Sequence, residues 1–443
     1  MEEKPRVVIV GGGFGGLAAA HALAKAEAEV ALFDRHNHHL FQPLLYQVAT
    51  AALSPGNIAA PIRKILSRQK NCDVIMAEVT DVDVDARTVT VIDQPYAYDY
   101  LILAAGACTE YFGNERWSTA APGLKTISEA IDVRCRFLLA FEQAEIETDE
   151  AAREAALTFA IVGAGPTGVE MAGAMAEISR QTLRADFRHL DTSTVRIMLI
   201  DAADRVLPTF APALSQRAGR DLESLDVEML LGTTVVDVDD TGLVVEGTEG
   251  RRRIDAAQVI WAAGVRGVPL GERLGGEADR SGRVIVSDDL SMPGHPEVFV
   301  VGDLARRVDP LSKKPVPGVA QGAIQMGRFA GRTVAVEISA RQRGKPPPER
   351  RVFVYRDRGS MATIGRNKAI AEVWGLRFGG FPAFLAWALI HILFLIGFRN
   401  RLMVMTEWIW MFLTFGRGVR LITGEDRVPR PVRPPPDPRL GRP

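Results

Sequence analysis

The chain has 443 residues, of which 47% are hydrophobic and 24% are charged, and this length suggests about three folded domains. The composition excludes a fibrous repeat, a largely disordered chain and a protein of many membrane spans. The three cysteines include no closely spaced pair, which argues against a disulfide framework and favours a reducing compartment. Residues 341–443 carry 19 Lys or Arg against 7 Asp or Glu, so we expect this region to meet a polyanionic partner, either nucleic acid or an anionic membrane.

The first element predicted along the chain is a buried strand. Residues 1–6 mix both charges and residues 7–10 are apolar, but glycines follow at once, so we expect no signal peptide and a body that stays in the cytoplasm. The apolar, largely β-branched run 6–10 is typical of a strand buried on both faces of a parallel sheet. A glycine-rich turn, a helix at 17–25 and a second strand at 30–33 complete the unit, which ends at Asp34.

The glycines of this unit form a dinucleotide fingerprint. Gly11 permits the tight turn, Gly13 lets the backbone approach a pyrophosphate, and Gly16 lets the helix pack closely on the strand. The start of the helix, near Phe14, supplies free N–H groups and a partial positive charge for the phosphates. Asp34 lies where a carboxylate can accept hydrogen bonds from ribose hydroxyls.

The same pattern recurs later in the chain. It comprises a strand at 157–162, glycines 163, 165 and 168, a helix at 169–179, and a strand at 195–200 that ends at Asp201. Residues 180–194 are an insertion relative to the first unit, and we expect them to form extra helix or loop before that strand. Two fingerprints indicate two nucleotides, one resident and one exchanging, which suits FAD and NAD(P)H. Asp201 favours NADH over NADPH because a carboxylate repels a 2′-phosphate, although Arg205 lies nearby.

Three further predicted strands end in small or acidic residues that suit the binding of a cofactor. One ends at Ala105-Gly106, one at Ala263-Gly264, and one stops at Asp303. We predict an α/β fold with two Rossmann-like dinucleotide-binding domains, the FAD domain discontinuous and the NADH domain inserted, and a C-terminal membrane-docking helical module. The expected bounds are 1–115 and 276–345 for the FAD domain, 116–275 for the NADH domain, 346–424 for the C-terminal module and 425–443 for a disordered Pro/Arg-rich tail.

The C-terminal module contains the most apolar part of the chain. Residues 381–398 have no formal charge and would form a helix about 27 Å long, and residues 402–415 are interrupted only by Glu407. Three tryptophans, Trp387, Trp408 and Trp410, suit a position at headgroup depth. We expect a pair of helices lying on an anionic membrane, rather than a membrane span or a soluble dimer core. The apolar density argues against nucleic acid.

Three segments resemble the type II, non-proton-pumping NADH:quinone oxidoreductases of the two-dinucleotide-binding-domain flavoproteins. They are His39-Leu-Phe-Gln-Pro-Leu-Leu-Tyr-Gln-Val-Ala-Thr50, Ala320-Gln-Gly-Ala-Ile-Gln325 and Gly359-Ser-Met-Ala-Thr-Ile-Gly365, within a match from about residue 6 to Thr423. The resemblance implies a peripheral respiratory enzyme on the cytoplasmic face of the plasma membrane. Such an enzyme passes hydride from NADH to tightly bound FAD and then two electrons to a membrane quinone, in ping-pong order. The sequence leaves open which quinone is used and whether the chain dimerises.

The resemblance also assigns site residues. It implies catalytic roles for Glu170, near nicotinamide and flavin, and for Gln321 and Gln325, which lie on one helix face beside the flavin and the quinone. The residues expected to bind FAD are Gly11, Gly13, Phe14, Gly16, Asp34, Ala105, Gly106, Asp303, Ala320 and Gln321. Those expected to bind NADH are Gly163, Gly165, Gly168, Glu170, Asp201 and Gly264.

Alternative functions differ from this prediction in ways that the sequence addresses. A soluble NAD(P)H-dependent ferredoxin or rubredoxin reductase of the same fold would not explain the apolar C-terminal segments. A sulfide:quinone oxidoreductase needs reactive cysteines, one of them late in the chain, and no cysteine follows Cys135. A non-catalytic flavin-binding membrane scaffold is a third alternative. The histidines at 36, 38 and 39 have no carboxylate or cysteine at ligand spacing, so we expect no metal site.

Overall fold

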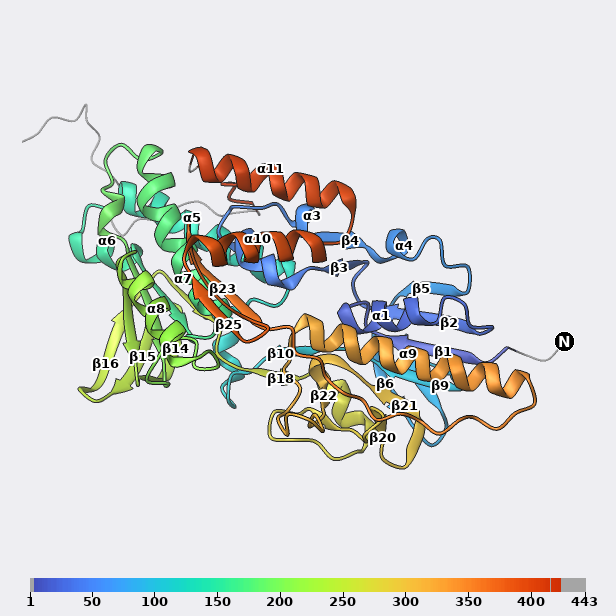
Figure 1. The fold of residues 1–443 in the computed structure, drawn as a ribbon. Helices are drawn as coiled ribbons and strands as arrows, with labels where there is room; N and C mark the ends of the chain where they lie inside the picture. Colours follow the sequence, from blue (N-terminus) through green and yellow to red (C-terminus); the bar gives the residue numbers. More distant parts are fainter. Residues whose placement is uncertain (1–3, 415, 424–443) are drawn as a thin grey trace, which may run out of the picture. The chain divides into compact units, whose positions relative to one another are not determined.

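The computed structural model describes residues 4–414 and 416–423, and the chain divides into two compact units (Figure 1). The first unit comprises Met1–Leu40, Ala59–Cys108 and Val265–Asp357. The second comprises Phe41–Ile58, Thr109–Gly264 and Arg358–Pro443. Each unit contains one of the two glycine fingerprints. The domain bounds expected from the sequence stay a prediction, and the expected disordered tail, 425–443, lies outside the described residues.

A six-stranded sheet forms the centre of the first unit. Its strands are β1 (Arg6–Val10), β2 (Glu29–Asp34), β5 (Cys72–Met76), β9 (Tyr100–Leu103), β20 (Ser291–Met292) and β21 (His295–Val300). They lie in the order β20-β21-β9-β1-β2-β5, and every pairing except β20 with β21 is parallel. The apolar side chains of β1 are buried, as a central parallel strand requires. A separate antiparallel sheet consists of β6 (Val79–Asp83), β7 (Thr88–Val91) and β8 (Gln94–Ala97).

Two helices pack closely against each other in the first unit. Helix α1 (Phe14–Ala22) follows β1, and α9 (Ala320–Gln342) lies along it (Figure 1). A Cβ atom on Gly327 would collide with the carbonyl oxygen of Gly15, and one on Gly331 would lie 2.6 Å from the carbonyl oxygen of Ala19. Glycine at these positions therefore lets the two backbones approach each other, which fixes the N-terminal end of α9 beside the first glycine turn.

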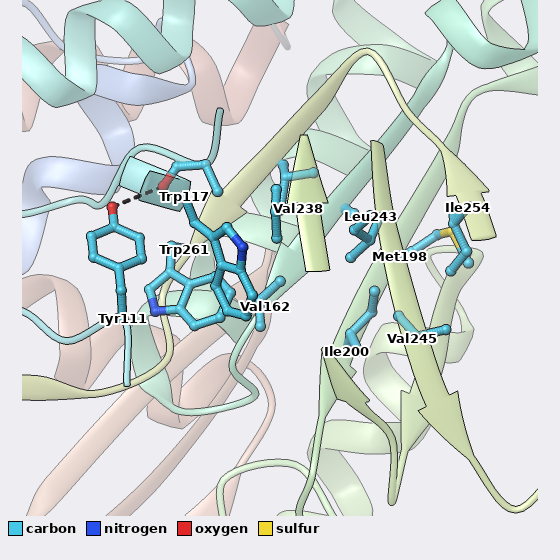
Figure 2. Close-up of a cluster of buried hydrophobic side chains, with 13 residues drawn as sticks. Tyr111, Trp117, Val162, Met198, Ile200, Val238, Leu243, Val245, Ile254 and Trp261 are labelled. Carbon is cyan, nitrogen blue, oxygen red and sulfur yellow. Dashed lines mark hydrogen bonds between the residues drawn. The ribbon is translucent and has the colours of Figure 1, made fainter. Parts of the chain in front are cut away.

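The second unit has a four-stranded parallel sheet in the order β13-β12-β11-β17. Its main elements are α5 (Ile127–Ile146), β11 (Thr158–Val162), α7 (Pro166–Glu177), β12 (Arg196–Asp201), β13 (Val227–Leu231) and β17 (Gln258–Trp261). An antiparallel sheet of β14 (Thr234–Asp239), β15 (Gly242–Gly247) and β16 (Gly250–Asp255) packs beside it. Figure 2 shows the buried cluster between them, in which Trp261 lies against Tyr111 and Trp117. The insert 180–194 contains short helical turns, as expected.

The C-terminal part of the second unit combines a small sheet with two helices. Strands β23 (Ser360–Gly365), β24 (Lys368–Val373) and β25 (Leu376–Gly379) are antiparallel and precede α10 (Phe381–Phe394) and α11 (Phe398–Thr414) (Figure 1). The expectation of one helix over 381–398 is wrong: Leu395 has an extended backbone and Gly397 has a φ of +90°, so the chain turns there. Among the described residues, no helix is both long enough and apolar enough to cross a bilayer.

The Pro- and Arg-rich segment 341–351 is held to the first unit at one point. Helix α9 extends to Gln342, and Arg350 then makes ion pairs of 2.5 Å with Glu337 on α9 and 2.9 Å with Asp289. The hydroxyl of Tyr100 donates a further hydrogen bond of 2.9 Å to Glu337. The basic side chain of Arg350 therefore anchors the chain to the first unit.

Candidate functional site

The first glycine turn and Asp34 lie together at the carboxyl end of β1. Gly11 has a φ of +103° and its N–H donates to the carbonyl oxygen of Phe33 at 2.7 Å. The Asp34 carboxylate accepts the N–H of Gly12 at 2.6 Å and that of His36 at 2.7 Å. A Cβ on Gly16 would collide with the carbonyl oxygen of Gly11, whereas one on Gly13 would meet no atom within 4 Å. The backbone beside Gly13 is thus open on the side from which a phosphate would approach.

The other residues expected to bind FAD converge on this turn. The position of a Cβ on Gly15 lies 3.3 Å from Val301, which follows β21, and 3.7 Å from Ala104, which follows β9. It also lies 3.5 Å from the carbonyl oxygen of Ala323 on α9. The strand ends that carry Ala105, Gly106 and Asp303, and the N-terminal turn that carries Ala320 and Gln321, therefore surround the first turn of α1.

His39 contacts the first glycine turn, which the sequence did not reveal. Its Nδ1 lies 3.1 Å from the carbonyl oxygen of Gly12, and its ring packs edge-on against Phe14 at 4.8 Å between centroids. Burial lowers the pKa of His39, so the neutral ring donates its Nδ1–H to Gly12. Its Nε2 is buried and has no hydrogen-bond partner among the described residues. His39 thus supports the glycine turn and leaves one polar atom for another group.

Gln325 is already engaged in the first unit. Its Nε2 donates to the carbonyl oxygen of Arg356 at 2.9 Å, and its Oε1 accepts the N–H of Arg356 at 3.0 Å. Both amide atoms are therefore used by the backbone of one residue. The roles expected for Gln321 and Gln325 stay predictions.

The second glycine turn repeats the geometry of the first. Gly163 has a φ of +107° and donates to the carbonyl oxygen of Ile200, while the Asp201 carboxylate accepts the N–H groups of Ala164 and Ala203. A Cβ on Gly168 would collide with the carbonyl oxygen of Gly163, whereas one on Gly165 would meet no atom within 4 Å. In both turns the strand-end aspartate holds the second residue of the turn.

Two other residues that the sequence singled out, Gly264 and Arg205, lie outside the hydrogen bonds of this turn. Gly264, after β17, has a φ of +79° and is exposed. The guanidinium of Arg205 donates to the carbonyl oxygen of Pro208 at 2.8 Å. That hydrogen bond directs the guanidinium toward the loop that carries Arg205 itself. In the part of the chain that the structure describes, Arg205 forms no ion pair with Asp201.

Glu170 lies on α7 where this helix meets β23. Its Oε1 is 3.5 Å from the backbone nitrogen of Thr363. The close approach of the two elements depends on Gly173, since a Cβ there would collide with the carbonyl oxygen of Ile364. Burial raises the pKa of Glu170 to about 8, although the Thr363 N–H and the Trp387 side chain oppose the shift. The carboxyl is therefore largely protonated at pH 7.

The second unit also contains a pocket of about 110 Å³ that the sequence did not reveal. Its lining comes from α2 (Leu45–Ala49), α7, β23, α10, α11 and the segment after α11. One wall is aromatic: the rings of Trp387 and Trp408 have centroids 5.0 Å apart, and Phe384 stacks at 6.2 Å from Trp387 and 6.3 Å from Phe412. An aromatic wall of this kind favours a flat, apolar ligand.

The lining of this pocket also includes polar side chains. The Gln47 amide donates to the Tyr46 hydroxyl at 2.9 Å and accepts the Trp408 indole N–H at 2.7 Å. Arg417 donates to the carbonyl oxygen of Thr50 at 2.9 Å. Tyr46 and Gln47 lie in the segment 39–50 that carried the family resemblance, so that motif was the available signal. For Arg417 the sequence offered no comparable signal, since it is only one of several arginines that flank the apolar helices.

Comparisons with known proteins agree with this arrangement. Residues 5–327 match the family described as pyridine nucleotide-disulphide oxidoreductase, and residues 358–418 match the NDH2 C-terminal domain. The type II NADH:quinone oxidoreductase NdhA of Mycobacterium tuberculosis is 47% identical over 432 residues, which cover 95% of this chain and 90% of that protein. The type II NADH:quinone oxidoreductase Ndh of the same organism is 46% identical over 436 residues, which cover 96% and 92%.

The fold is also found among solved structures. A structure of NDH2 from Plasmodium falciparum in complex with NADH gives a TM-score of 0.84 at 20% identity, and the match covers 94% of this chain and all of that one. At this identity the likeness shows a shared fold alone. Together with the sequence matches it confirms the α/β fold and the resemblance expected from the sequence.

Proposed function

The chain belongs to the family of type II NADH:quinone oxidoreductases, and we propose that it oxidises NADH and reduces a quinone with FAD as its bound cofactor. The observation that carries the proposal is the pair of glycine turns with the same geometry, one in each unit, in a chain that matches this family over 95% of its length. FAD, when bound, supplies the redox chemistry, because its ring accepts a hydride from NADH and delivers two electrons to a quinone.

The first unit fits FAD. The open backbone at Gly13 accommodates a pyrophosphate, and the N-terminus of α1 directs N–H groups toward it. Asp34 is oriented by two backbone N–H groups, and the buried Nε2 of His39 leaves one polar atom to be satisfied. The residues that would hold FAD are those expected from the sequence: Gly11, Gly13, Phe14, Gly16, Asp34, Ala105, Gly106, Asp303, Ala320 and Gln321.

The second unit fits NADH in the same way. Gly163, Gly165 and Gly168 shape the turn at the start of α7, and Gly264 follows the neighbouring strand β17. Asp201, oriented by two backbone N–H groups, would accept the ribose hydroxyls and disfavour a 2′-phosphate. We therefore propose NADH over NADPH. In the ping-pong order NAD leaves before quinone is reduced, so each substrate meets the enzyme in turn.

The pocket of the second unit is our candidate for the quinone ring. An engineered cavity of about 150 Å³ holds one benzene molecule, so a pocket of about 110 Å³ suits one small ring with its tail outside. Aromatic side chains would contact the faces of the ring, while Tyr46, Gln47 and Arg417 supply polar groups for the carbonyl oxygens. Glu170, which the raised pKa keeps largely protonated at pH 7, adds no negative charge nearby.

We further propose that α10 and α11 bind the cytoplasmic face of an anionic membrane. Leu385, Leu389 and Leu393 form a stripe on one face of α10, and each is more than half exposed. Trp410 and Leu413 are exposed on α11, and arginines at 399 and 401 lie in its first turn. An apolar face next to basic residues suits a helix that lies in the headgroup region. A second copy of the chain is the alternative occupant of this face.

The proposed activity is tested with the purified protein by following NADH oxidation with a short-chain quinone as acceptor and with NADPH as the alternative donor. We expect quinone-dependent oxidation of NADH and far slower oxidation of NADPH. A protein that retains bound FAD and oxidises NADH, yet transfers no electrons to any quinone, would contradict the proposal and favour the ferredoxin-reductase alternative.

The sulfide:quinone alternative is disfavoured by the cysteines. Burial raises the pKa of the Cys72 thiol to about 12, which keeps it protonated and unreactive at pH 7. Cys135 is buried on α5 against the backbone of Thr423. Neither thiol has the exposed, electropositive surroundings of a reactive cysteine.

A further inference from the structure

We propose that Arg417 binds the electron acceptor directly, through a charge-assisted hydrogen bond from its guanidinium to one ring oxygen of a quinone held in the pocket of the second unit. This inference rests on the proposed function and goes beyond it by assigning a group that stabilises the reduced acceptor. The sequence did not single out Arg417 itself, and the assignment depends on the burial, the contacts and the charges described next.

The guanidinium of Arg417 is buried and has donor capacity to spare. Its side chain is 10% exposed and lines the pocket. Nη1 donates to the carbonyl oxygen of Thr50 at 2.9 Å, while Nη2 lies 3.6 Å from the nearer carboxylate oxygen of Glu177, which is too long for a hydrogen bond. A guanidinium carries five N–H donors. Its contacts with the described residues therefore satisfy only part of that capacity.

The charge of Arg417 is only partly compensated by its neighbours. The titratable groups that act on Arg417 are Glu177 on α7 and Tyr46 on α2, and Arg366 after β23 also lines the pocket. Glu177 is shared, because its other oxygen accepts the backbone N–H of Arg366, whose guanidinium lies 4.4 Å from the ring centroid of Phe412. Burial raises the pKa of Tyr46 well above its usual value, so the phenol is neutral. The carboxylate of Glu177, 3.6 Å from Nη2 of Arg417, therefore compensates the charge of that guanidinium only in part.

A partly compensated cation suits the chemistry of quinone reduction. A quinone is neutral when it enters, takes up two electrons and two protons, and leaves as a neutral quinol. NADH supplies both electrons and one proton as a hydride, and water supplies the second proton. Negative charge builds on the ring oxygens when electrons arrive before protons, so a fixed cation there stabilises the transition state more than the bound quinone. Arg417 is not the proton source, because a guanidinium keeps its protons.

A purely structural role explains less. The segment 416–423 has two other attachments outside the pocket: Arg420 pairs with Asp186 at 2.9 Å, and the N–H of Thr423 donates to the Cys135 sulfur at 3.3 Å. Removing a guanidinium from water is unfavourable, and a single ion pair at 3.6 Å does not offset that penalty fully. A third attachment of this kind would stabilise the segment less than an apolar side chain of similar size.

The inference is tested by comparing Arg417→Gln, Arg417→Lys and the control Arg420→Gln, all as FAD-loaded protein. Loss of a hydrogen bond to a charged donor predicts a fall of roughly 10- to 100-fold in kcat for a short-chain quinone, with KM changed less than about threefold. Reduction of the bound flavin by NADH should keep its wild-type rate, and Arg417→Lys should recover part of the loss. Arg420→Gln, which removes an ion pair from the same segment outside the pocket, should stay within about twofold of wild type.

A binding measurement gives a second readout that does not depend on turnover. A hydroxynaphthoquinone that is anionic at neutral pH should quench the fluorescence of Trp387 and Trp408, which line the pocket. Arg417→Gln should weaken its binding roughly 10-fold or more, and weaken binding of a neutral quinone of the same size much less. Equal weakening for both probes would overturn the charge-based role.

Folding is controlled by removing the opposite charge as well. Arg417→Gln leaves Glu177 without its buried partner, so the double variant Arg417→Gln/Glu177→Gln should regain the Tm and flavin content that the single variant loses. Quinone turnover should remain low in the double variant. Recovered turnover, or equal losses in Arg417→Gln and Arg420→Gln, would show that Arg417 is only structural. Failure of the wild-type protein to reduce any quinone would instead contradict the proposed function itself.

Discussion

The buried carboxyl of Glu170 should make stability depend on pH in a direction opposite to that of a carboxylate whose pKa is lowered by an ion pair. Its pKa is raised from 4.5 to about 8 in the folded protein, chiefly by burial. Between these two values the folded protein binds more protons than the unfolded chain, so the free energy of unfolding falls as pH rises. At 1.36 kcal/mol per pH unit, the loss across this window is at most about 5 kcal/mol.

Glu170→Gln removes this dependence and keeps the shape of the side chain. The difference in unfolding free energy between variant and wild type should therefore grow in favour of the variant from pH 5 to pH 9. For a protein of this size 1 kcal/mol corresponds to roughly 1–2 °C in Tm, so the Tm difference should grow by about 5–10 °C over that range.

The assay is a series of thermal unfolding curves of both FAD-loaded proteins at steps of pH, with Glu142→Gln as the matched control. Glu142 is another helical glutamate with a raised pKa, and it lies on α5, away from the pocket. Its substitution should change the pH profile much less, because it is less buried. Parallel profiles for Glu170→Gln and wild type would refute the claim that α7 and β23 bury this carboxyl.

Three further predictions follow from the first unit. Gly16→Ala should abolish flavin binding, because the new Cβ forces α1 away from the glycine turn. Gly13→Ala should leave the Tm of the FAD-free protein at the wild-type value and weaken FAD binding, as measured by flavin content and titration. Equal behaviour of the two variants would contradict the assigned roles. Arg350→Ala should lower the unfolding free energy by about 3–5 kcal/mol, since it leaves the buried carboxylate of Glu337 unpaired, and a change below 1 kcal/mol in denaturant titration would contradict this. Gln325→Ala should slow quinone reduction while reduction of the flavin by NADH stays fast, and equal loss in both steps would exclude a role at the acceptor.

The sequence predicted the parts of the fold that depend on local pattern. Strand β1 was expected at 6–10 and lies at Arg6–Val10, because a β-branched run followed by glycine has few other structures available. The two strand-end aspartates were found from similar patterns: Asp34 ends an apolar strand at the spacing of a dinucleotide fingerprint, and Asp201 ends an apolar strand once the insert 180–194 is allowed for. Their hydrogen bonds to the glycine turns were not foreseen, since these join segments more than 20 residues apart.

The C-terminal part shows where local pattern fails. The apolar run 381–398 gave no sign of its interruption except Gly397, a residue that helices also tolerate, and the backbone turns there because α11 packs back along α10 (Figure 1). The pocket depends on three segments that are distant in the sequence and carry Gln47, Thr363 and Arg417. No spacing in the sequence brings such segments together, so the charge of Arg417 could be placed only by the folded structure.

The measurement that tests the central claim most directly is anaerobic stopped-flow absorbance with two successive mixing steps. The purified protein is first mixed with one equivalent of NADH and then, after the flavin absorbance has fallen, with a quinone. We predict that the flavin band bleaches with NADH and returns in full when quinone is added, with one quinol formed for each NADH consumed. A flavin that bleaches but is not reoxidised by any quinone, or that does not respond to NADH, would contradict the account.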